Sequence, residues 1–492
     1  MVKIRVRFAP SPTGIPHIGN TRTALYNYLF ARRYQGKFIL RIEDTDQKRQ
    51  MPQSLPKILE ILNFIGIQWD EGPQVNGPYG PYIQSKRLKI YKKFAEELIA
   101  QKKAYYCFCT PQKLKRIRAA QQKKGQSSRY DRHCLRLKPQ KIKTLKKHTK
   151  YCIRLLVPDK GITCWNDLVQ DRLCFKNKDI DDQVLLKSDG FPTYHLSVVV
   201  DDHLMKITHI LRGAEWISST PKHILLYKAF GWHPPKIGHF PISLGPDKSK
   251  LSKRHGAKSA LDYRDEGYLP QALVNFMVFL GWSYRDNSDI LTLKQLTRLF
   301  SLKKIQKANP IFDIKKLDWF NAQHLKRVST EELFDALKPW FPKKSNRFYI
   351  KQTIPLIKDR LTKLSNFDSL TDFFFKKIKF NLKLLPKKEN PQQILEELIE
   401  TNKNLKLILA WSKKNIERVI RNLALKKNWS PSQYFMLIRL ATTGKTATPP
   451  LFETLEVLGK IEVVKRIKAA ERVIKKLYFN NHYNAYQTQT KS

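Results

Sequence analysis

The first 45 residues contain the pattern that most restricts how this chain can fold. Apolar and basic residues alternate over residues 2–8, which is the period of a β-strand. A turn rich in proline and glycine follows, and apolar residues then recur at helical spacing over residues 24–29. Gly36 is expected to end this helix before a second strand over residues 37–42. A strand, a helix and a second strand in this order predict two parallel neighbouring strands.

A later stretch with the same alternation predicts the other half of the sheet. Residues 207–211 are an apolar strand candidate, and residues 216–230 are a helix candidate. The segment from about residue 84 to residue 187 is expected to be an insertion, which contains all six cysteines and a strand candidate over residues 151–157. The amino-terminal half is therefore predicted to be a doubly wound α/β sheet with an insertion.

From about residue 262 onward the sequence favours helices and shows few strand signals. Apolar residues recur at helical spacing in five segments separated by Pro, Asn and Gly, namely residues 269–280, 331–337, 392–399, 415–425 and 455–477. The carboxyl-terminal half is therefore predicted to be mostly α-helical.

The formal charge of the chain points to its partners. Lys and Arg number 92 and Asp and Glu number 42, which gives 92 − 42 = +50. Such a charge favours a polyanionic partner, with RNA, DNA or an anionic surface as the candidates. The alternative is that a Lys-rich lineage spreads basic residues over all its proteins. Because the basic residues are scattered along the chain, both explanations remain open.

The sequence contains no segment that predicts a membrane span or a secretory signal. The longest nearly uncharged run, residues 272–282, is shorter than the ~20 apolar residues that cross a bilayer. The strand pattern at the amino terminus differs from the apolar core of a signal peptide. We expect a cytoplasmic protein without a membrane partner. Six cysteines in a chain of this length are also too sparse for a framework of disulfides.

The turn after the first strand, R-F-A-P-S-P-T-G-I-P-H-I-G-N over residues 7–20, is a candidate phosphate site. In an open parallel sheet the strand ends and the following helix starts face one crevice, where unpaired N–H groups and the helix dipole favour phosphate. His17 could donate a hydrogen bond to a polyphosphate, and the small Gly19 would let it approach closely. Alone, this pair is weak evidence, because a structural histidine is the commoner case.

The segment K-L-S-K-R over residues 250–254 is a second candidate. Lys250 and Lys253 stand three residues apart in a loop framed by glycine and proline. Such a loop could close over a triphosphate and neutralise the charge that develops on the leaving pyrophosphate. Alone, it could equally be a basic surface loop. Together with a histidine after the first strand, it is a specific signal for a nucleotide cleft.

Six motifs together resemble one family. They are the turn over residues 7–20, R-I-E-D-T-D (41–46), P-T-Y-H-L (192–196), V-V-D-D-H (199–203), L-R-G-A-E-W (211–216) and K-L-S-K-R. With them the chain resembles the class I aminoacyl-tRNA synthetases, and specifically the bacterial type of glutamyl-tRNA synthetase. The resemblance covers nearly the whole chain, but beyond residue 254 it rests on general pattern and on L-A-T-T-G-K-T-A-T-P-P-L-F-E (440–453). Asn20 is a departure at a position that varies in glutamyl enzymes.

The resemblance implies a glutamate–tRNA ligase that acts as a monomer. Glutamate attacks the α-phosphate of ATP, whose phosphates carry Mg²⁺, and the glutamyl-adenylate is transferred to the 3'-terminal ribose of tRNA-Glu. A non-discriminating enzyme that also charges tRNA-Gln remains an alternative. A glutamyl-queuosine-type tRNA modifier is less expected, because 492 − 254 = 238 residues follow Arg254 and such enzymes lack this half. A non-catalytic RNA-binding descendant is disfavoured because His17 and Lys253 are both present.

The implied architecture is an α/β Rossmann-type catalytic domain with an α+β insertion, followed by a mostly α-helical carboxyl-terminal half. Its expected parts are the first half of the catalytic domain (1–83), an acceptor-stem-binding insertion (84–187), the second half of the catalytic domain with the K-L-S-K-R loop (188–258), a helical connecting domain (259–328) and an α-helical anticodon-binding domain (329–492).

The resemblance also assigns roles to individual residues. The catalytic group is His17, Lys250 and Lys253, within an ATP site that comprises Pro10, Thr13, Gly14, His17, Gly19, Lys250, Leu251, Ser252, Lys253 and Arg254. The glutamate site comprises Arg7, Ala9, Ser11, Glu43, Tyr194, Arg212 and Trp216. The carboxylate of Glu43 can hold an ammonium group. Arg7 and Arg212 can offer bidentate forks to a carboxylate, which would select glutamate over glutamine.

One departure concerns the segment after P-T-Y-H-L. Ser197 and Val198 stand where relatives often carry Ala and Asn. If the asparagine normally touches the amino acid, Val198 cannot replace its hydrogen bonds, and the pocket would be slightly rebuilt.

The cysteines of the insertion raise the question of zinc. Cys107, Cys109 and Cys134 could bind Zn²⁺, with the phenolate of Tyr130, His133 or water as the fourth ligand. The arrangement resembles the Cys, Cys, Tyr, Cys set of some glutamyl enzymes, whereas other relatives have no zinc and reduced free cysteines are the alternative. The remaining thiols fit no metal spacing and are expected to be buried as small hydrophobes, namely Cys152, Cys164 and Cys174.

Anticodon recognition would need arginines that can form forks or stack on exposed bases. Arg360 and Arg439 lie in segments that resemble the anticodon-binding helices. For either residue alone, a solvent-exposed arginine is the commoner case.

Overall fold

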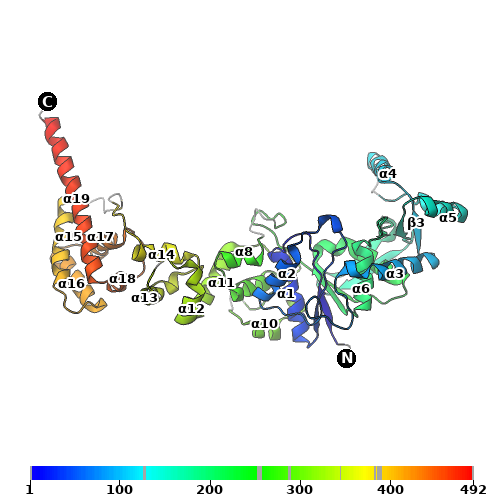
Figure 1. The fold of residues 1–492 in the computed structure, drawn as a ribbon, viewed down its shortest axis with the longest axis horizontal. Helices are drawn as coiled ribbons and strands as arrows, with labels where there is room; N and C mark the ends of the chain where they lie inside the picture. The colour runs from blue at the N-terminus through cyan, green and yellow to red at the C-terminus, as the bar shows by residue number, and fades with distance from the viewer. Residues whose placement is uncertain are drawn as a thin grey trace. The chain divides into compact units, whose positions relative to one another are not determined.

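The computed structural model describes residues 3–125, 129–251, 258–285, 290–343, 345–381, 384 and 390–489. The chain divides into two units, one of residues 1–265 and 269–320 and the other of residues 266–268 and 321–492. The first unit contains every strand that these described ranges include, and the second is helical. Figure 1 follows the chain from β1 to α19.

The predicted strand–helix–strand pattern begins the first unit. β1 (Arg5–Phe8) pairs in parallel with β2 (Lys37–Leu40), and α1 (Ile18–Arg33) connects them. The apolar stripe of α1, which includes Ala24 and Leu25, is fully buried, as its spacing predicts. Both strands therefore end at the same edge, where the turn over residues 7–20 begins.

The second half of the α/β fold lies beside the first. α6 (Tyr194–Leu204) precedes β8 (His209–Gly213), which pairs in parallel with β9 (Lys236–Phe240). The amide of Thr208 donates to the carbonyl oxygen of Arg5 at 3.0 Å, so β8 runs next to β1. The helix predicted over residues 216–230 is present as two pieces, η5 (Ala214–Ser219) and α7 (Thr220–Ala229).

The insertion forms one sheet of its own and adds one hairpin to the sheet of β8 and β9. β3 (Ala104–Cys107), β4 (Cys152–Leu155) and β7 (Val184–Leu186) form an antiparallel sheet in that order. The hairpin of β5 (Ile162–Asp167) and β6 (Asp171–Lys176) instead joins β9, which gives the order β6–β5–β9–β8. The insertion is thus connected to the sheet of β8 and β9 through β5.

Two helices of the insertion lie almost wholly on the surface. α4 (Pro111–Lys123) and α5 (Pro139–His148) contain no buried residue, and both lie near β3 (Figure 1). Lys and Arg recur along each of them. Part of the excess positive charge is therefore concentrated on two exposed helices, which favours a polyanionic partner over uniform scatter.

The helices predicted beyond residue 262 are present, with boundaries that differ from the predicted ones. Gly459, with φ of 82°, divides the helix predicted over residues 455–477 in two. No helix among the described residues is long and apolar enough to span a membrane. The remaining α-helices are α2 (Ser54–Phe64), α3 (Leu88–Ala100), α8 (Ala260–Asp265), α9 (Pro270–Phe279), α10 (Leu293–Leu299), α11 (Ile314–Arg327), α12 (Thr330–Leu337), α13 (Arg347–Ile357), α14 (Asn366–Phe375), α15 (Pro391–Lys406), α16 (Lys413–Lys426), α17 (Pro431–Thr443), α18 (Leu451–Leu458) and α19 (Lys460–Gln489).

The glycine after α1 acts differently from the prediction. Gln35, with φ of 50°, is the left-handed residue that follows α1, so Gly36 does not supply the turn. Gly36 is instead needed for space, because a Cβ atom there would lie 2.5 Å from the carbonyl oxygen of Ile4. That same carbonyl accepts the amide of Lys37 at 2.8 Å, which fixes the start of the β1–β2 pair.

We expect Gly36→Ala to destabilise the first unit by about 1–3 kcal/mol, because the added methyl group must push β1 and β2 apart. Urea unfolding followed by circular dichroism measures the effect. Gly14→Ala is the matched control, since a Cβ atom at Gly14 would have no neighbour within 4 Å. Equal unfolding midpoints for the two variants would contradict this account.

Candidate active site

One cleft gathers most of the residues that the sequence selects. Its volume is about 850 Å³, and it opens at the carboxyl ends of β1, β2 and β8 and at the start of α6. Ten of the predicted residues line it: Arg7, Ala9, Pro10, Ser11, Thr13, Gly14, Glu43, Tyr194, Arg212 and Trp216. Residues far apart in sequence thus meet at one edge, as expected for strands of a parallel sheet.

Several lining residues carry no sequence signal that we used. They include Asn20, Thr23, Asp46, Lys187 and Glu215. Asn20, Asp46 and Glu215 stand within quoted motifs, so their positions could have suggested the cleft. Lys187 could not be found in this way, because it reaches the cleft from the end of the insertion, where its Nζ donates to the carbonyl oxygen of Thr45 at 3.2 Å.

His17 is the residue that caps the amino terminus of α1. Its Nδ1 accepts the amide N–H of Gly19 at 3.0 Å, so in the neutral ring the proton resides on Nε2, which can donate to an anion. Burial and the charge of Lys250 lower the pKa of His17, which keeps the ring neutral at pH 7. Gly19 is required for this fold-back, because a Cβ atom there would lie 2.9 Å from the His17 ring.

The start of α1 differs from the expectation of free N–H groups. The amides of Ile18, Gly19 and Asn20 all donate within the protein, to the Lys258 carbonyl, to the His17 ring and to the His17 carbonyl respectively. A phosphate at this helix would therefore meet side chains and the helix dipole, and not these three amides.

The K-L-S-K-R segment approaches the same helix. The amide of Leu251 donates to the Ser243 carbonyl oxygen at 3.1 Å, and Lys258, just beyond the segment, accepts from Ile18 at 2.9 Å. Lys250 is close enough to His17 to lower its pKa. Ser252, Lys253 and Arg254 lie outside the described residues. The chain just beyond K-L-S-K-R thus contacts the amino terminus of α1, and the charge of Lys250 acts on His17.

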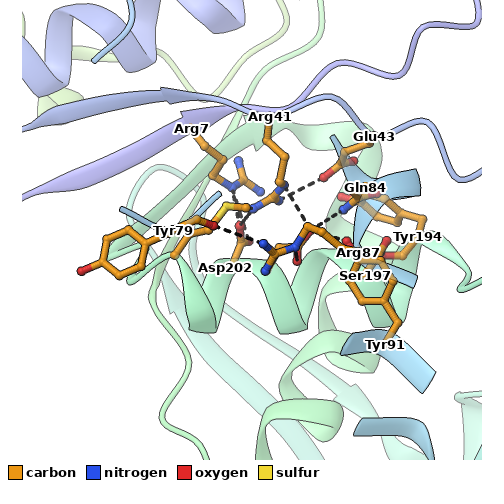
Figure 2. Close-up of polar contacts among 12 residues, drawn as sticks. Arg7, Arg41, Glu43, Tyr79, Gln84, Arg87, Tyr91, Tyr194, Ser197 and Asp202 are labelled. Carbon is orange, nitrogen blue, oxygen red and sulfur yellow. Dashed lines mark hydrogen bonds and ion pairs between the residues drawn. The ribbon is translucent and has the colours of Figure 1, made fainter. Parts of the chain in front are cut away.

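A buried set of charges stands behind the cleft (Figure 2). Asp202 of α6 accepts from Nε of Arg7 at 3.1 and 3.3 Å and from Nη1 of Arg41 at 2.7 Å. Arg41 is fully buried, and its Nη2 donates to Glu43 at 3.0 Å. Although burial raises the pKa of Asp202, Arg7 and Arg41 hold it below its usual value, so the carboxylate is ionised.

The neighbouring aspartate anchors the start of the insertion. Asp201 accepts from Arg87 at 2.8 Å, from Gln84 at 2.9 Å and from the hydroxyl of Tyr91 at 2.8 Å. Nε of Arg41 also lies 3.9 Å from Asp201, so the two carboxylates of V-V-D-D-H share Arg41 and otherwise bind different partners.

Arg7 and Glu43 face the cleft with functional atoms to spare. Asp202 holds Arg7 only through Nε, and the two Nη groups have no partner among the described residues. Such a guanidinium can still form a bidentate pair with a carboxylate. Burial raises the pKa of Glu43 above its usual value. The charges of Arg41 and Arg7 oppose this increase, so the carboxyl group lies beside two cations.

Arg212 is held far more tightly than Arg7. Its Nε donates to His239 at 3.2 Å, its Nη1 to Tyr194 at 3.0 Å and to His223 at 3.3 Å, and its Nη2 to Thr220 at 2.8 Å. Four of its five N–H donors are used, so Arg212 cannot offer the expected pair of N–H donors to a carboxylate in this arrangement. Because the Tyr194 oxygen accepts from Arg212, its own O–H is free to donate, and one Arg212 N–H remains beside it.

The comparisons with known proteins agree with this geometry. Residues 3–319 match the catalytic domain of the class I tRNA synthetases (E and Q), and residues 332–471 match an anticodon binding domain. The glutamate–tRNA ligase of Dehalococcoides mccartyi is 44% identical over 95% of this chain and 97% of that protein, and that of Borreliella burgdorferi is 43% identical over 96% and 99%. A crystal structure of the glutamate tRNA ligase of Elizabethkingia meningosepticum in complex with its amino acid superposes with a TM-score of 0.88 at 35% identity, covering 96% of this chain and 100% of that one.

The chain belongs to the glutamate–tRNA ligase family. The predicted family, the α/β Rossmann-type fold followed by a mostly helical half, and the aminoacyl-tRNA ligase class are confirmed. An anticodon-binding half is present, which disfavours a glutamyl-queuosine-type modifier.

The two residues of the departure after P-T-Y-H-L, Ser197 and Val198, do not line the cleft. Val198 is 2% exposed and packs into the apolar core with residues such as Leu196 and Leu226. The hydroxyl of Ser197 donates to the backbone carbonyls of Thr193 and Tyr194 at the start of α6. Val198 therefore makes no direct contact with the cleft, and a rebuilt pocket stays a prediction.

The three predicted cysteine ligands meet at the end of β3. The Sγ atoms of Cys107, Cys109 and Cys134 all lie within 4.8 Å of one another, and the hydroxyl of Tyr130 is 3.3 Å from Sγ of Cys109. Hydrogen bonds from Cys134 and Cys152 lower the pKa of the Cys107 thiol. His133 is exposed and outside this group. The donors and spacings fit a tetrahedral zinc site with Tyr130 as the fourth ligand.

The other cysteines differ from the expectation of simple burial. Cys164 and Cys174 form a disulfide, because the β5–β6 register places them directly opposite each other with their Cα atoms 4.1 Å apart. Cys174 is exposed. Cys152 is half-buried and faces Cys107 across β3–β4. The expectation failed because spacing along the chain does not reveal strand register.

The two candidate anticodon arginines have different surroundings. Burial lowers the pKa of Arg439, and the charge of Arg360 adds to this effect. Nη1 of Arg439 donates to Thr448 and to the Pro449 carbonyl oxygen, which fixes the turn before α18. Arg360 is exposed at the end of a short 3₁₀ turn, η9 (Lys358–Arg360). Arg360 is therefore the better placed of the two to meet a base.

A pH-dependent loss of stability is expected from the histidines behind Arg212. Nδ1 of His195 lies 3.0 Å from Nε2 of His223, and burial together with Lys222 lowers the pKa of His195 to about 4. The unfolded chain, with a histidine pKa near 6.5, binds the extra proton first. This part of the stability is therefore present above pH 6.5 and is lost as the pH falls towards 4, by an amount on the order of 1–2 kcal/mol at pH 5.

Thermal unfolding at pH 7 and pH 5 measures this loss. His195→Asn should show a smaller drop in unfolding midpoint between the two pH values than the wild type. An equal drop in both proteins would show that His195 is already protonated in the folded state.

Proposed function

We propose that this protein activates L-glutamate with ATP and transfers it from glutamyl-adenylate to the 3'-terminal ribose of tRNA-Glu. One observation carries the proposal. The two free Nη groups of Arg7, the Tyr194 hydroxyl beside Arg212, and Glu43 line one cleft, next to the helix start where His17 and Lys250 meet. Carboxylate recognition and phosphate recognition are therefore adjacent.

The amino-acid end of the cleft suits glutamate. Glu43 can hold the ammonium group. Arg7 can supply a fork, and Arg212 with Tyr194 can supply one N–H and one O–H, to the side-chain carboxylate. Glutamine offers an amide whose NH₂ group would face these donors, so it should bind poorly. Ala9, Ser11 and Trp216 complete the lining.

The phosphate end relies on fewer described residues. His17 would donate from Nε2, and Lys250 would neutralise charge on the leaving pyrophosphate. Pro10, Thr13 and Gly14 line the cleft nearby, whereas Gly19 and Leu251 act through the backbone geometry described above. Mg²⁺ would bridge the ATP phosphates. The roles of Ser252, Lys253 and Arg254 rest on the sequence motif alone.

The remaining predictions follow from this role and stay predictions. They are the division into five parts at residues 83, 187, 258 and 328, a monomer, a cytoplasmic location, and base contacts by Arg360 and Arg439. Charging of tRNA-Gln as well as tRNA-Glu remains the alternative function, since nothing in the described residues favours one anticodon.

Exchange of labelled pyrophosphate into ATP tests the proposal. We expect exchange with L-glutamate in the presence of tRNA-Glu, and little exchange with L-glutamine under the same conditions. Preference for glutamine would overturn the assignment of the pocket. A parallel measurement of acylation with tRNA-Glu and tRNA-Gln distinguishes the discriminating enzyme from the non-discriminating one.

The variant Arg212→Gln sharpens this test. It should raise the KM for glutamate by at least about tenfold and leave the KM for ATP nearly unchanged, because it removes donors from the carboxylate end only. Equal losses for both substrates would show that Arg212 does not serve the side-chain carboxylate.

We also propose that one zinc ion is bound by Cys107, Cys109, Cys134 and Tyr130. The support is that three thiols lie within 4.8 Å of one another, with the Tyr130 hydroxyl 3.3 Å from Cys109, in a segment that otherwise has a small core. Zinc bound there would link the end of β3 to the loop that contains Cys134, and so would stiffen the base of the insertion.

Metal analysis of the purified protein checks the zinc site. We expect about one zinc per chain in the wild type and a loss of most of it in Cys109→Ser. Cys152→Ser is the matched control, because Cys152 lies beside Cys107 but outside the group of three, and it should keep the metal. Zinc-free wild type from zinc-supplemented cells, or equal zinc in the two variants, would contradict the proposal.

A further inference from the structure

We propose that Asp167 of the insertion positions Arg212 through His239, and so tunes the recognition of the substrate side chain from outside the cleft. The proposal rests on the function proposed above, in which Arg212 serves the glutamate carboxylate. Asp167 does not line the cleft and belongs to no motif quoted from the sequence. It acts as a positioning residue and not as a group that touches substrate.

Asp167 is a saturated hydrogen-bond acceptor. Its Oδ1 accepts the backbone N–H groups of His239, Val169 and Gln170, each at 3.0 Å. Its Oδ2 accepts Nε1 of Trp165 at 3.1 Å and Nδ1 of His239 at 2.5 Å. Every partner is a donor, so the carboxylate is fixed in position and orientation at the point where β5 pairs with β9.

This set of bonds determines which nitrogen of His239 carries the proton. The hydrogen bond from His239 lowers the pKa of Asp167 to about 2 against the effect of burial, so Asp167 is ionised and can only accept. His239 must therefore carry its proton on Nδ1. Burial lowers the pKa of His239 although Asp167 opposes this, so the ring is neutral and Nε2 has a free lone pair.

The lone pair of His239 fixes the guanidinium of Arg212. Nε of Arg212 donates to Nε2 of His239 at 3.2 Å, while Nη2 donates to Thr220 at 2.8 Å. The hydroxyl of Thr220 is itself 3.1 Å from the same His239 nitrogen. One edge of Arg212 is thus locked against His239 and Thr220, which turns the opposite edge towards Tyr194 and the cleft.

An asparagine at position 167 would reverse this arrangement. If its oxygen keeps the three backbone donors, its NH₂ group donates to Nδ1 of His239, and the indole N–H of Trp165 loses its acceptor. The proton of His239 then moves to Nε2, where it points at the N–H of Arg212. Two donors cannot share one hydrogen bond, so Arg212 would have to turn away. The change in volume is negligible, so packing alone predicts no such effect.

Steady-state exchange kinetics with tRNA-Glu test the consequence for the substrate. Asp167→Asn should raise the KM for glutamate by at least about tenfold while the KM for ATP changes by less than about twofold. Asp179→Asn is the matched control, because Asp179 is an exposed aspartate of the same insertion and should behave as the wild type. Equal effects on both substrates, or no effect, would overturn the proposal.

A double-mutant comparison separates positioning from general damage. In a His239→Ala background, Asp167→Asn should add less than about twofold to the KM for glutamate, since its route to Arg212 is already removed. A further tenfold rise in that background would show that Asp167 does not act through His239.

Nitrogen-15 spectra of histidine-labelled protein test the arrangement without any assay. We expect the His239 signals of the wild type to show a protonated Nδ1 and an unprotonated Nε2, with the reverse in Asp167→Asn. A protonated Nε2 in the wild type would overturn the proposal even if Asp167→Asn does not fold. If the wild type shows no glutamate-dependent exchange but the expected tautomer, the proposed function fails while this positioning stands.

Discussion

The carboxylate of Asp202 is the contact on which the cleft depends. It binds Arg7 from the end of β1 and Arg41 from the segment after β2, while it is itself fully buried on α6. These three elements are separated by up to 195 residues along the chain. Removing one partner of such a buried set leaves an uncompensated charge, which typically costs about 3–5 kcal/mol. Asp202 therefore explains both how α6 is held against the two strands and why Arg7 presents its Nη groups to the cleft.

The two arginines of the cleft show two ways of preparing a cation for a ligand. Arg7 is bound at one nitrogen and keeps a fork, whereas Arg212 is bound at four donors and keeps one. The first can adapt to its partner and the second is rigid. In the proposed function a neutral His17 and Lys250 would serve the phosphates, and the two guanidinium groups would serve the side-chain carboxylate.

The sequence predicted features that depend on residues close along the chain or on residues at the carboxyl ends of neighbouring strands. The spacing of residues 24–29 gave the buried face of α1, and the quoted motifs gave ten residues of one cleft. It failed where a contact depends on register or on a distant partner. The Cys164–Cys174 disulfide follows from the β5–β6 pairing, and Val198 is in the core because α6 turns it there. Gly36 leaves space for the carbonyl oxygen of Ile4 and does not form the turn. The link from Asp167 to Arg212 spans two such pairings and left no signal in the motifs.

A crystal structure with L-glutamate and a non-hydrolysable ATP analogue is the most direct test of this account. We predict that the side-chain carboxylate of glutamate lies within hydrogen-bond distance of both Nη atoms of Arg7 and of the Tyr194 hydroxyl. The ammonium group should contact Glu43, and a phosphate oxygen should contact Nε2 of His17. A glutamate whose side chain points away from Arg7 and Arg212, or an ATP analogue bound away from the start of α1, would contradict it.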